Sequence, residues 1–541
     1  MDTDVIYRRR WYTLIVLCMS LLVIGIDNTI LNVALPTLSE KLGATNSQLQ
    51  WMVDSYVIVF AGLLLTAGAL GDRFGRKKAL TAGLVVFGAG SVLAAFSGSA
   101  GHLISTRALM GASAAFIMPA TLSILTNVFT DSSERAKAIG VWAGVSALGI
   151  AVGPLAGGWL LEHFSWGSVF LVNVPFVIAA LVAGHFFVPE SKDPDAPRLD
   201  LVGAALSIAG LVTFLWGIIE APSKGWTAPE VLAAFAAGAV LLGAFVIWEL
   251  RSDHPMLDVR FFRNPRFSAA SGAITLAFFA MFGAMFVLTQ YLQAVLGLTA
   301  LEAGLRLAPI SLVLMIVAPT ANIWVRRFGS KYVVATGLAI AALGLVLMSR
   351  LGTEASTWQV IGVLAVLGVG MGNVMAPATD SIMGSLPRER AGVGSAVNDT
   401  TREVGGALGV AIIGSLLASS YRNSIDAGLA NAGLPAPAYD AVRDSIGGAV
   451  AVSQQASGQF PTQAAQVLAT AREAYVSAMR PAMLVGAGFI ALGALVVLFF
   501  LPARSTEEAA ELELEAAERE PEVELEAVYG PVLPGVAGAE I

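Results

Sequence analysis

Long blocks of apolar residues alternate with short polar segments along most of this 541-residue chain. A block of about 20 apolar residues is long enough for one helix to cross the hydrocarbon core of a bilayer. The repeated blocks therefore predict one all-α body of fourteen membrane-spanning helices rather than several soluble domains. We expect the spans at residues 12–35, 49–70, 79–97, 102–126, 136–160, 168–189, 199–219, 230–250, 267–291, 303–325, 333–350, 357–383, 395–419 and 480–502.

The composition agrees with a membrane protein. Hydrophobic residues make up 56% of the chain and charged residues 13%, whereas soluble domains contain about 25% charged residues. The net charge of −7 comes from a tail at 503–541 that holds eleven glutamates, and the remaining body is mildly basic. Cys18 is the only cysteine and the four histidines are scattered. We therefore expect no intrachain disulfide, no metal site and no cofactor.

Basic residues distinguish the two sides of the predicted membrane protein. With the N-terminus inside, the inner loops hold clusters of lysine and arginine at 73–78, 260–266 and 326–331. The short outer loops hold only Lys41, Lys224 and Arg350. Cytoplasmic loops carry this kind of positive excess. We expect a multi-pass protein of the cytoplasmic membrane with both termini in the cytoplasm.

The two halves of the chain share a short repeat. The segment GDRFGRKKALTAGL from Gly71 matches VRRFGSKYVVATGL from Val325, and each would join an inward-running span to an outward-running one. The match predicts two related six-helix bundles with two inserted helices between them, and halves of this kind place a binding site at their interface. The expected units are an N-terminal bundle at 1–190, the inserted pair at 191–266, a C-terminal bundle at 267–502 and the acidic tail at 503–541.

Two long segments lie outside the predicted spans. Residues 420–479 form an expected outer loop, which either carries short amphipathic helices near 437–452 and 461–477 or is a weakly ordered cap. The tail at 503–541 alternates glutamate with alanine and leucine, so we expect it to be solvated and not catalytic.

An acid inside the first span is the strongest candidate for chemistry. An aspartate in a spanning helix costs about 2.5–3.5 kcal/mol to insert, so it usually faces a polar interior and has a function. Beside Asp27, the same helix carries Asn28, Thr29 and Asn32 as a hydrophilic flank. One interpretation of Asp27 is a carboxylate that takes up and releases a proton. The other is a structural, hydrogen-bonded aspartate.

Arg107 is the only cation well inside the N-terminal half, at a depth that permits contact with the region of Asp27. An unpaired cation would be costly there, so we expect either a partner or a cluster of carbonyl groups. Arg107 would either hold a carboxylate ionised until a proton or substrate displaces it, or only cross-link helices.

The fifth predicted span carries a stripe of glycines. Gly149, Gly153 and Gly157 recur every four residues, Gly158 follows, and Pro154 predicts a kink in the middle of the run. A helix face without side chains allows very close packing against a neighbour.

A short basic turn joins the second and third spans. The turn GALGDRFGRKKAL starts at Gly68 and places Asp72 and Arg73 before Gly75 and Arg76. Glycine lets helix ends approach closely, and the charges can bridge the inner ends of neighbouring helices. A simple stop-transfer loop explains the positive charge but not the acid and the glycines.

Weaker candidates lie elsewhere in the spans. Asp54, near the outer end of the second span, either lines a cavity or reaches outer water. The run NDTTREV places Asn398, Asp399, Arg402 and Glu403 close together, with Asn398 and Arg402 on one helix face. These residues either line a central cavity or form a solvated helix start, and the sequence slightly favours the second interpretation.

These segments together resemble the major facilitator superfamily, specifically its fourteen-helix drug:proton antiporters of the EmrB/QacA type. The turn from Gly68 resembles the cytoplasmic gate motif between helices 2 and 3, and ISTRALMGASAA resembles the helix 4 motif around Arg107. The run through Gly153 and Pro154 resembles the antiporter motif of helix 5. The segment DNTILNVALP resembles the helix 1 motif of drug exporters, with Asp27 at the acidic position.

The resemblance implies roles for these motifs. Asp72 and Arg73 would latch the inner gate in the outward-open state, and Arg107 would assist proton coupling. The glycine–proline helix would bend during the switch between states. The second copy of the gate motif departs from the pattern, because Arg326 stands where the first copy has Asp72.

The implied function is proton-coupled efflux of amphipathic or lipophilic drugs and toxic compounds by alternating access. The partners would be these small molecules, protons and membrane lipids, without nucleic acid. A dedicated exporter of one endogenous metabolite, antibiotic or lipid would carry the same motifs, whereas an uptake symporter fits the fifth span less well. We expect no enzyme, because the sequence has no paired catalytic acids on a loop, no metal cluster and no nucleotide-binding loop.

Overall fold

The computed structural model describes all residues apart from 1–2, 193–199, 256, 386–390, 430–433 and 503–541, so the acidic tail lies outside the described residues. The described part is helical and contains no strand. Its elements are α1 (Thr3–Leu42), α2 (Asn46–Phe74), α3 (Arg76–Ala95), α4 (Ala100–Val128), α5 (Ser132–His163), α6 (Ser168–Leu171), α7 (Asn173–Phe187), α8 (Leu201–Lys224), α9 (Pro229–Arg251), η1 (Val259–Arg263), α10 (Pro265–Gln290), η2 (Tyr291–Val295), α11 (Ala300–Phe328), α12 (Ser330–Met348), α13 (Thr357–Met383), α14 (Ala391–Leu429), α15 (Ala436–Asp444), α16 (Ile446–Ala456) and α17 (Pro461–Phe500).

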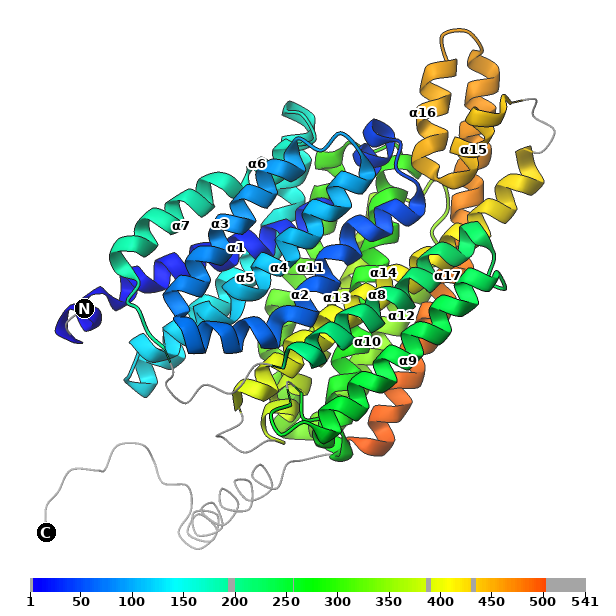
Figure 1. The fold of residues 1–541 in the computed structure, drawn as a ribbon. Coiled ribbons are helices and arrows are strands. Elements are labelled where there is room, and N and C mark those ends of the chain that lie inside the picture. The colour runs from blue at the N-terminus through cyan, green and yellow to red at the C-terminus, as the bar shows by residue number, and fades with distance from the viewer. Residues whose placement is uncertain (1–2, 193–199, 256, 386–390, 430–433, 503–541) are drawn as a thin grey trace, which may run out of the picture.

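The helices form two bundles that meet along a central seam (Figure 1). In the first bundle α2 packs against α4 and α1 against α5, and in the second α11 packs against α13 and α10 against α14. These pairings correspond one to one. Across the seam, α5 contacts α11 and α2 contacts α14, which are again corresponding pairs. The arrangement is the one that the sequence repeat predicts.

The repeated sequence folds into the same turn in both bundles. α2 ends at Phe74, Gly75 has a φ of 122°, and α3 begins at Arg76. In the second bundle α11 ends at Phe328 and Gly329 has a φ of 85°. Positive φ favours glycine because a Cβ atom would be strained there. One glycine therefore reverses the chain between two long helices in each copy.

The inserted pair α8–α9 lies on the outside of the seam between α2 and α14. Ser47 of the first bundle donates a hydrogen bond to the carbonyl oxygen of Ile219 at 3.2 Å. Arg422 of the second bundle donates one to the carbonyl oxygen of Pro222 at 3.3 Å. The end of α8 is thus hydrogen-bonded to both bundles.

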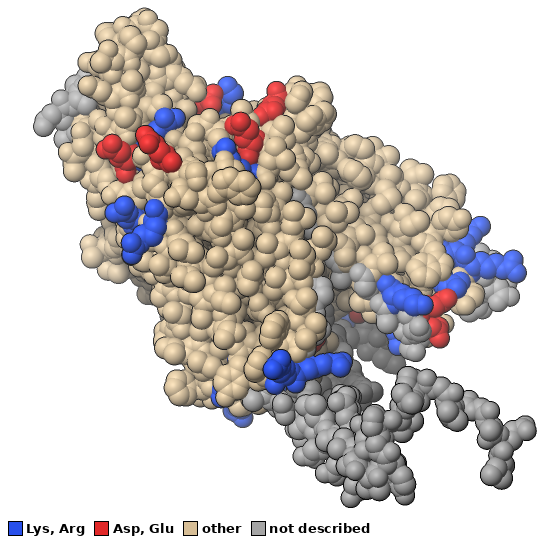
Figure 2. Space-filling model, turned by 180° about the vertical axis from the view of Figure 1, so that it is seen from behind, with Lys and Arg blue, Asp and Glu red and all other residues tan. Residues whose placement is uncertain are grey.

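The hairpin of α15 and α16 projects beyond the other helices (Figure 1). We call this end of the molecule the outer end, as predicted for residues 420–479, and the opposite end the inner end. Charged side chains gather toward the two ends and leave a broad band between them (Figure 2). Large apolar side chains such as Val240, Met315 and Leu492 are more than half exposed. A large exposed apolar surface of this kind is typical of contact with lipid.

The number of spans is close to the prediction. Among the described residues, 12 helices are long and apolar enough to cross a membrane, or 13 if the two parts of α2 count as one span. The span predicted at 136–160 lies in α5, a 32-residue helix in which several side chains lie outside the description. The all-α, multi-pass fold is confirmed, and the count of fourteen is not confirmed exactly.

The described part of the predicted outer loop at 420–479 is mostly helical, which agrees with the first of its two interpretations. α14 continues to Leu429, and α17 begins at Pro461, so the span predicted at 480–502 is the second half of a 40-residue helix. The short helices expected near 437–452 are present as α15 and α16. They separate at Ser445, whose extended backbone ends α15 and whose hydroxyl caps α16 by accepting the Gly448 N–H at 3.0 Å.

Candidate functional site

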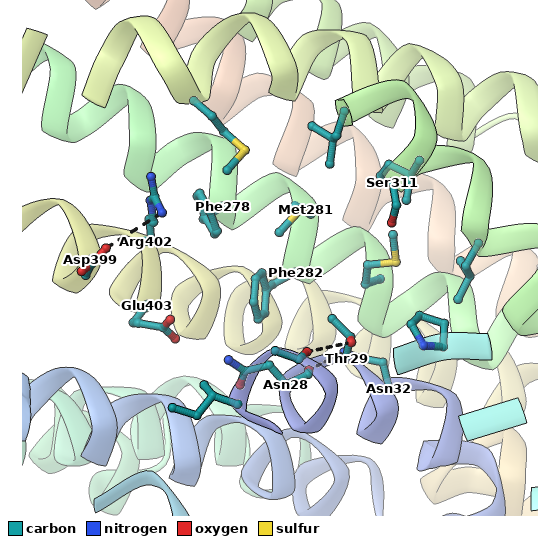
Figure 3. Close-up of a pocket in the computed structure, with 18 of the residues that line it drawn as sticks. Asn28, Thr29, Asn32, Phe278, Met281, Phe282, Ser311, Asp399, Arg402 and Glu403 are labelled. Atoms are coloured by element: carbon teal, nitrogen blue, oxygen red, sulfur yellow. Dashed lines mark hydrogen bonds and ion pairs between the residues drawn. The ribbon is translucent and has the colours of Figure 1, made fainter. Parts of the chain in front are cut away.

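A cavity of about 160 Å³ lies between the two bundles (Figure 3). α1, α10, α11 and α14 supply most of its wall. The apolar part is rich in methionine and phenylalanine, with Met281, Phe282 and Met285 from α10. Methionine side chains are flexible and polarisable, so they adapt to ligands of different shapes. The wall therefore suits apolar surfaces without fixing one shape.

The hydrophilic flank of α1 forms the opposite wall. Asn28, Thr29 and Asn32 face the cavity (Figure 3). The Asn32 amide donates to the Asn28 carbonyl oxygen at 3.3 Å, and the Thr29 hydroxyl donates to the Gly25 carbonyl oxygen at 3.1 Å. The cavity thus offers amide groups to a ligand on one side and apolar contacts on the other.

α14 adds a charged cluster to the cavity wall. Asp399 and Arg402 form an ion pair at 3.9 Å, and the Arg402 guanidinium lies 5.5 Å from the centre of the Phe278 ring. Glu403 also faces the cavity, and its Oε2 is buried without a hydrogen-bond partner among the described residues. A buried carboxylate oxygen without a donor costs free energy, so a ligand with a donor or a positive charge would be favoured here.

The interpretation of this run as a solvated helix start is wrong. α14 begins at Ala391, so Asp399 to Glu403 lie inside the helix, where it packs across the seam. Asn398 is buried and accepts a hydrogen bond from the Thr379 hydroxyl at 3.0 Å. Asn398 itself does not line the cavity.

Asp27 lies on another face of α1, inside the first bundle and outside the cavity lining. Its carboxylate forms an ion pair with Arg107, and both side chains are almost fully buried. The Asn173 amide donates to the second carboxylate oxygen at 3.0 Å. Arg107 also donates through Nε to the Met52 carbonyl oxygen at 3.1 Å. Helices α1, α2, α4 and α7 therefore meet at one buried charge pair.

Further polar groups surround this pair. The Arg107 guanidinium lies 4.3 Å from the centre of the Tyr56 ring, and Asn173 also donates to the Ser91 hydroxyl at 3.3 Å. The sequence reasoning missed Asn173, Tyr56 and Ser91. A lone amide in the apolar run FLVNVPFV was a usable signal for Asn173. Tyr56 and Ser91 gave none, because hydroxyl side chains are common in membrane helices.

Protonation of Asp27 would remove the charge that compensates Arg107. Removing one charge of a buried pair leaves the other uncompensated and costs about 3–5 kcal/mol. A proton bound to Asp27 would leave Arg107 in that position, so the packing of the helices around it would change.

Asp54 neither lines the central cavity nor reaches water. Its side chain is fully buried, and neither carboxylate oxygen has a hydrogen-bond partner among the described residues. The outer-water interpretation is wrong because the side chain is 0% exposed. One turn earlier, the Gln50 amide donates to the carbonyl oxygen of Val410 on α14 at 3.3 Å.

No group of three or more His, Cys, Asp or Glu that could hold a metal occurs among the described residues.

The glycine stripe of α5 packs against α1 and α11. A Cβ atom on Gly153 would lie 2.0 Å from the Thr29 hydroxyl oxygen, and one on Gly158 would lie 2.5 Å from the Leu301 Cα atom of the other bundle. No side chain fits at these distances, so α5 packs directly against the Thr29 side chain of α1 and the backbone of α11. α5 runs through Pro154 as a single helix. Gly149 and Gly157 approach α1 in the same way.

Further contacts join the two bundles at the outer end. They hold the bundles together on this side of the cavity, because they link the outer parts of α1, α2 and η2 with residues of the opposite bundle. The hydrogen bonds are Gln293 to the Val33 carbonyl oxygen (2.8 Å), Asn46 to the Gly414 carbonyl oxygen (3.4 Å) and Ser39 with Ser445 (3.2 Å).

The basic turn lies at the inner end of the first bundle. Asp72 forms an ion pair with Arg76 at 2.6 Å, within its own bundle, and both side chains are partly exposed. The Arg73 guanidinium lies 5.7 Å from the centre of the Phe74 ring. The latch that the family resemblance implies for Asp72 and Arg73 belongs to the outward-open state, so it stays a prediction.

One backbone hydrogen bond holds this turn in place. The Arg76 N–H donates to the carbonyl oxygen of Ser191 at 2.9 Å. On α2, a Cβ atom on Gly68 would lie 3.4 Å from Pro119 of α4, which is ordinary contact. The glycine at 68 is thus not required by space in this conformation.

Sequence comparison places the chain among transport proteins. Residues 17–410 match the profile of the Major Facilitator Superfamily. The multidrug efflux pump LfrA of Mycolicibacterium smegmatis is 38% identical over 489 residues, which cover 90% of this chain and 96% of LfrA. The methyl viologen resistance protein SmvA of Salmonella typhimurium is 36% identical, with 86% of this chain and 93% of SmvA covered.

A third relative and a solved structure extend this comparison. The tetracenomycin C resistance and export protein of Streptomyces glaucescens is 32% identical, with 93% of this chain and 94% of that protein covered. The crystal structure of a bacterial homolog to the human lysosomal transporter Spinster, in an inward-facing and unoccupied conformation, has a TM-score of 0.63 at 17% identity. It covers 91% of this chain and 98% of its own, and shows a shared fold.

Proposed function

This chain belongs to the Major Facilitator Superfamily, and from that premise we propose that it exports amphipathic or lipophilic drugs and toxic compounds in exchange for protons. It is a multi-pass membrane transporter and not an enzyme. The relatives described above are multidrug efflux and resistance proteins. The proposed site of action is the cytoplasmic membrane, with the inner end of the molecule toward the cytoplasm.

The central cavity carries this proposal. It lies between the bundles, and contacts at the outer end hold them together on that side. Its wall combines methionine and phenylalanine with the Asn28 and Asn32 amides and the Glu403 carboxylate. Such a wall favours amphipathic molecules, and Glu403 favours a positive charge on them. Alternating opening of the two ends would move a bound molecule outward.

Asp27 is the proposed proton carrier and Arg107 its switch. In the outer-closed conformation Arg107 compensates the charge of Asp27. Opening of the outer end rearranges the helices around this pair and admits a proton to the carboxylate. Closure of the outer end returns Arg107 to Asp27 and releases the proton toward the cytoplasm. Asp54 and Glu403 are further acids for a stoichiometry above one.

The available free energy suits this exchange. Moving one elementary charge inward through 100 mV yields about 2.3 kcal/mol, and one pH unit adds about 1.36 kcal/mol per proton. A tenfold gradient costs about 1.4 kcal/mol, so one charge at 100 mV supports a gradient of about fifty-fold for a neutral compound. A monovalent cation exchanged for one proton gains nothing from voltage and depends on the pH gradient.

Transport in proteoliposomes tests the proposal. We expect ethidium to accumulate in vesicles with an acidic lumen when the inner end of the protein faces outward. Accumulation should stop when nigericin collapses the pH gradient, because proton flux drives the step. Ethidium movement that is insensitive to nigericin in matched vesicles would contradict proton coupling.

A dedicated exporter is the second candidate function. The observation that favours it is the relative named for tetracenomycin C resistance and export, which aligns over 93% of this chain. A panel of chemically unrelated compounds separates the two candidates. Competition with ethidium efflux by several compound classes supports a multidrug transporter, whereas competition by a single compound supports a dedicated one.

Replacing Asp72 with alanine should slow transport turnover while leaving cargo affinity unchanged. Asp72 pairs with Arg76 at the inner end, far from the cavity lining, and the proposed latch forms only in the outward-open state. The measurement is the initial rate and half-saturating concentration of ethidium transport. Asp253→Ala, at an exposed acid in another inner loop, is the matched control. Equal turnover in both variants would refute the gate assignment.

A further inference from the structure

A second cavity, of about 780 Å³, lies at the outer end of the molecule. The turn between α1 and α2, the α15–α16 hairpin and the first turns of α17 enclose it. It is larger than the central cavity, and the two linings share no residue. The outer cavity is therefore a separate compartment that the transport cycle described above does not use.

Both bundles contribute to the outer cavity. Ser39, Glu40 and Thr45 come from the first bundle, whereas Ser445 and Ser453 belong to α16 and its cap in the second. The Ser39 and Ser445 hydroxyls are 3.2 Å apart at the point where the two parts meet. A molecule bound in this cavity would contact both bundles at once.

The charge of the lining is acidic. Glu40 and Asp444 supply carboxylates, and no lysine or arginine belongs to the described lining. Asp444 is held by Arg422 at 2.6 Å. Glu40 pairs with Lys41 at 2.9 Å on the surface, where a pair of this kind contributes little. Because the Glu40–Lys41 pair is solvent-exposed and weak, the Glu40 carboxylate can attract a positively charged ligand, whereas Arg422 already compensates Asp444.

Polar and apolar groups of the wall complete the site. Ser453 is 6% exposed, and its hydroxyl is buried without a hydrogen-bond partner among the described residues. A buried hydroxyl without a partner costs free energy that a bound ligand can recover. Phe460 lines the same cavity and is 57% exposed, so its ring face can contact a ligand cation. Val467 adds apolar surface below it.

We propose that the outer cavity is a second binding site for an amphipathic organic monocation, and that its occupant holds the two bundles together at the outer end. A ligand that binds one conformation more tightly than another shifts the equilibrium toward the first. Occupancy therefore favours the outer-closed conformation. One consequence rests on the proposed function. Exported cations that build up outside would occupy the outer cavity and slow the transporter.

Equilibrium binding of radiolabelled tetraphenylphosphonium to the purified full-length protein tests the site without requiring transport. We expect two saturable sites in the wild type. Gln463→Trp, in the cavity lining on α17, should leave one site, because the bulky indole takes space that the phenyl groups of the ligand need. Gln466→Trp is the matched control, since Gln466 is exposed on the same helix and does not line the cavity. It should keep two sites.

Two more variants assign the sites. Ser311→Trp fills the central cavity and should also leave one site, so the double variant Gln463→Trp/Ser311→Trp should bind none. Glu40→Gln should weaken the outer site roughly threefold to tenfold, because it removes the carboxylate that attracts the cation. A single site in the wild type, or equal site counts in Gln463→Trp and Gln466→Trp, would overturn the proposal. Two sites in a protein that fails to transport would instead contradict only the proposed function.

Discussion

Replacing Asp27 with asparagine is expected to reduce proton-driven ethidium transport to the level of protein-free vesicles. Asparagine has nearly the same size and can still accept the hydrogen bond from Asn173, but it carries no proton to exchange. Ethidium exchange without a proton gradient should persist, because the central cavity does not include Asp27. Both rates are measured in the same proteoliposome preparation.

A double variant separates this effect from misfolding. Asp27→Asn alone leaves Arg107 buried without its counter-charge, which costs about 3–5 kcal/mol and should lower the thermal midpoint. Asp27→Asn with Arg107→Gln removes both charges and should recover thermal stability without recovering proton-driven transport. Undiminished proton-driven transport in the single variant would remove Asp27 from the mechanism.

Replacing Gly158 with alanine is the second change with a large expected effect. Its Cβ atom would lie within 2.8 Å of three backbone atoms of Ala300 and Leu301 across the seam. Overpacking of this kind costs about 1–3 kcal/mol, and the cost applies only when the outer end is closed. The equilibrium should therefore shift toward the outward-open conformation by roughly 5- to 150-fold, and transport should fall with it.

Labelling of a cysteine introduced near the outer seam measures this shift. The single native cysteine is buried in α1 and is first replaced by alanine. Gly144→Ala is the control, because a Cβ atom on this glycine of α5 meets nothing within 4 Å. Faster labelling in Gly158→Ala than in Gly144→Ala is expected. Equal labelling and equal transport in the two variants would show that the backbone contact does not limit closure.

The sequence predicted the parts of the fold that depend on local pattern. Apolar blocks gave the helices, and the repeated motif located the two corresponding turns at Gly75 and Gly329. The glycine stripe predicted close packing but not its partner, because the partners α1 and α11 lie far away in the chain. The outer helices were placed less well, since their alternating polarity has little of the long apolar signal of a span.

The candidate site was predicted in its residue types more than in its geometry. Asp27 and Asn28 are neighbours in the sequence, so the sequence placed them in one polar region. A rotation of about 100° per residue sends Asn28 into the cavity and Asp27 into the first bundle. The burial of the Asp54 and Glu403 side chains depends on contacts between helices that are distant in the sequence, and no local sequence pattern shows such contacts.

The different orientations of Asp27 and Asn28 on α1 have a consequence for the evolution of resistance. Under the proposed mechanism the energy source and the cargo occupy different faces of one helix. Substitutions in the cavity wall, at Met281 or Phe282 for instance, can then admit new compounds without changing the Asp27–Arg107 pair. Selection with an unfamiliar toxin should enrich changes in that wall and spare Asp27, Arg107 and Asn173.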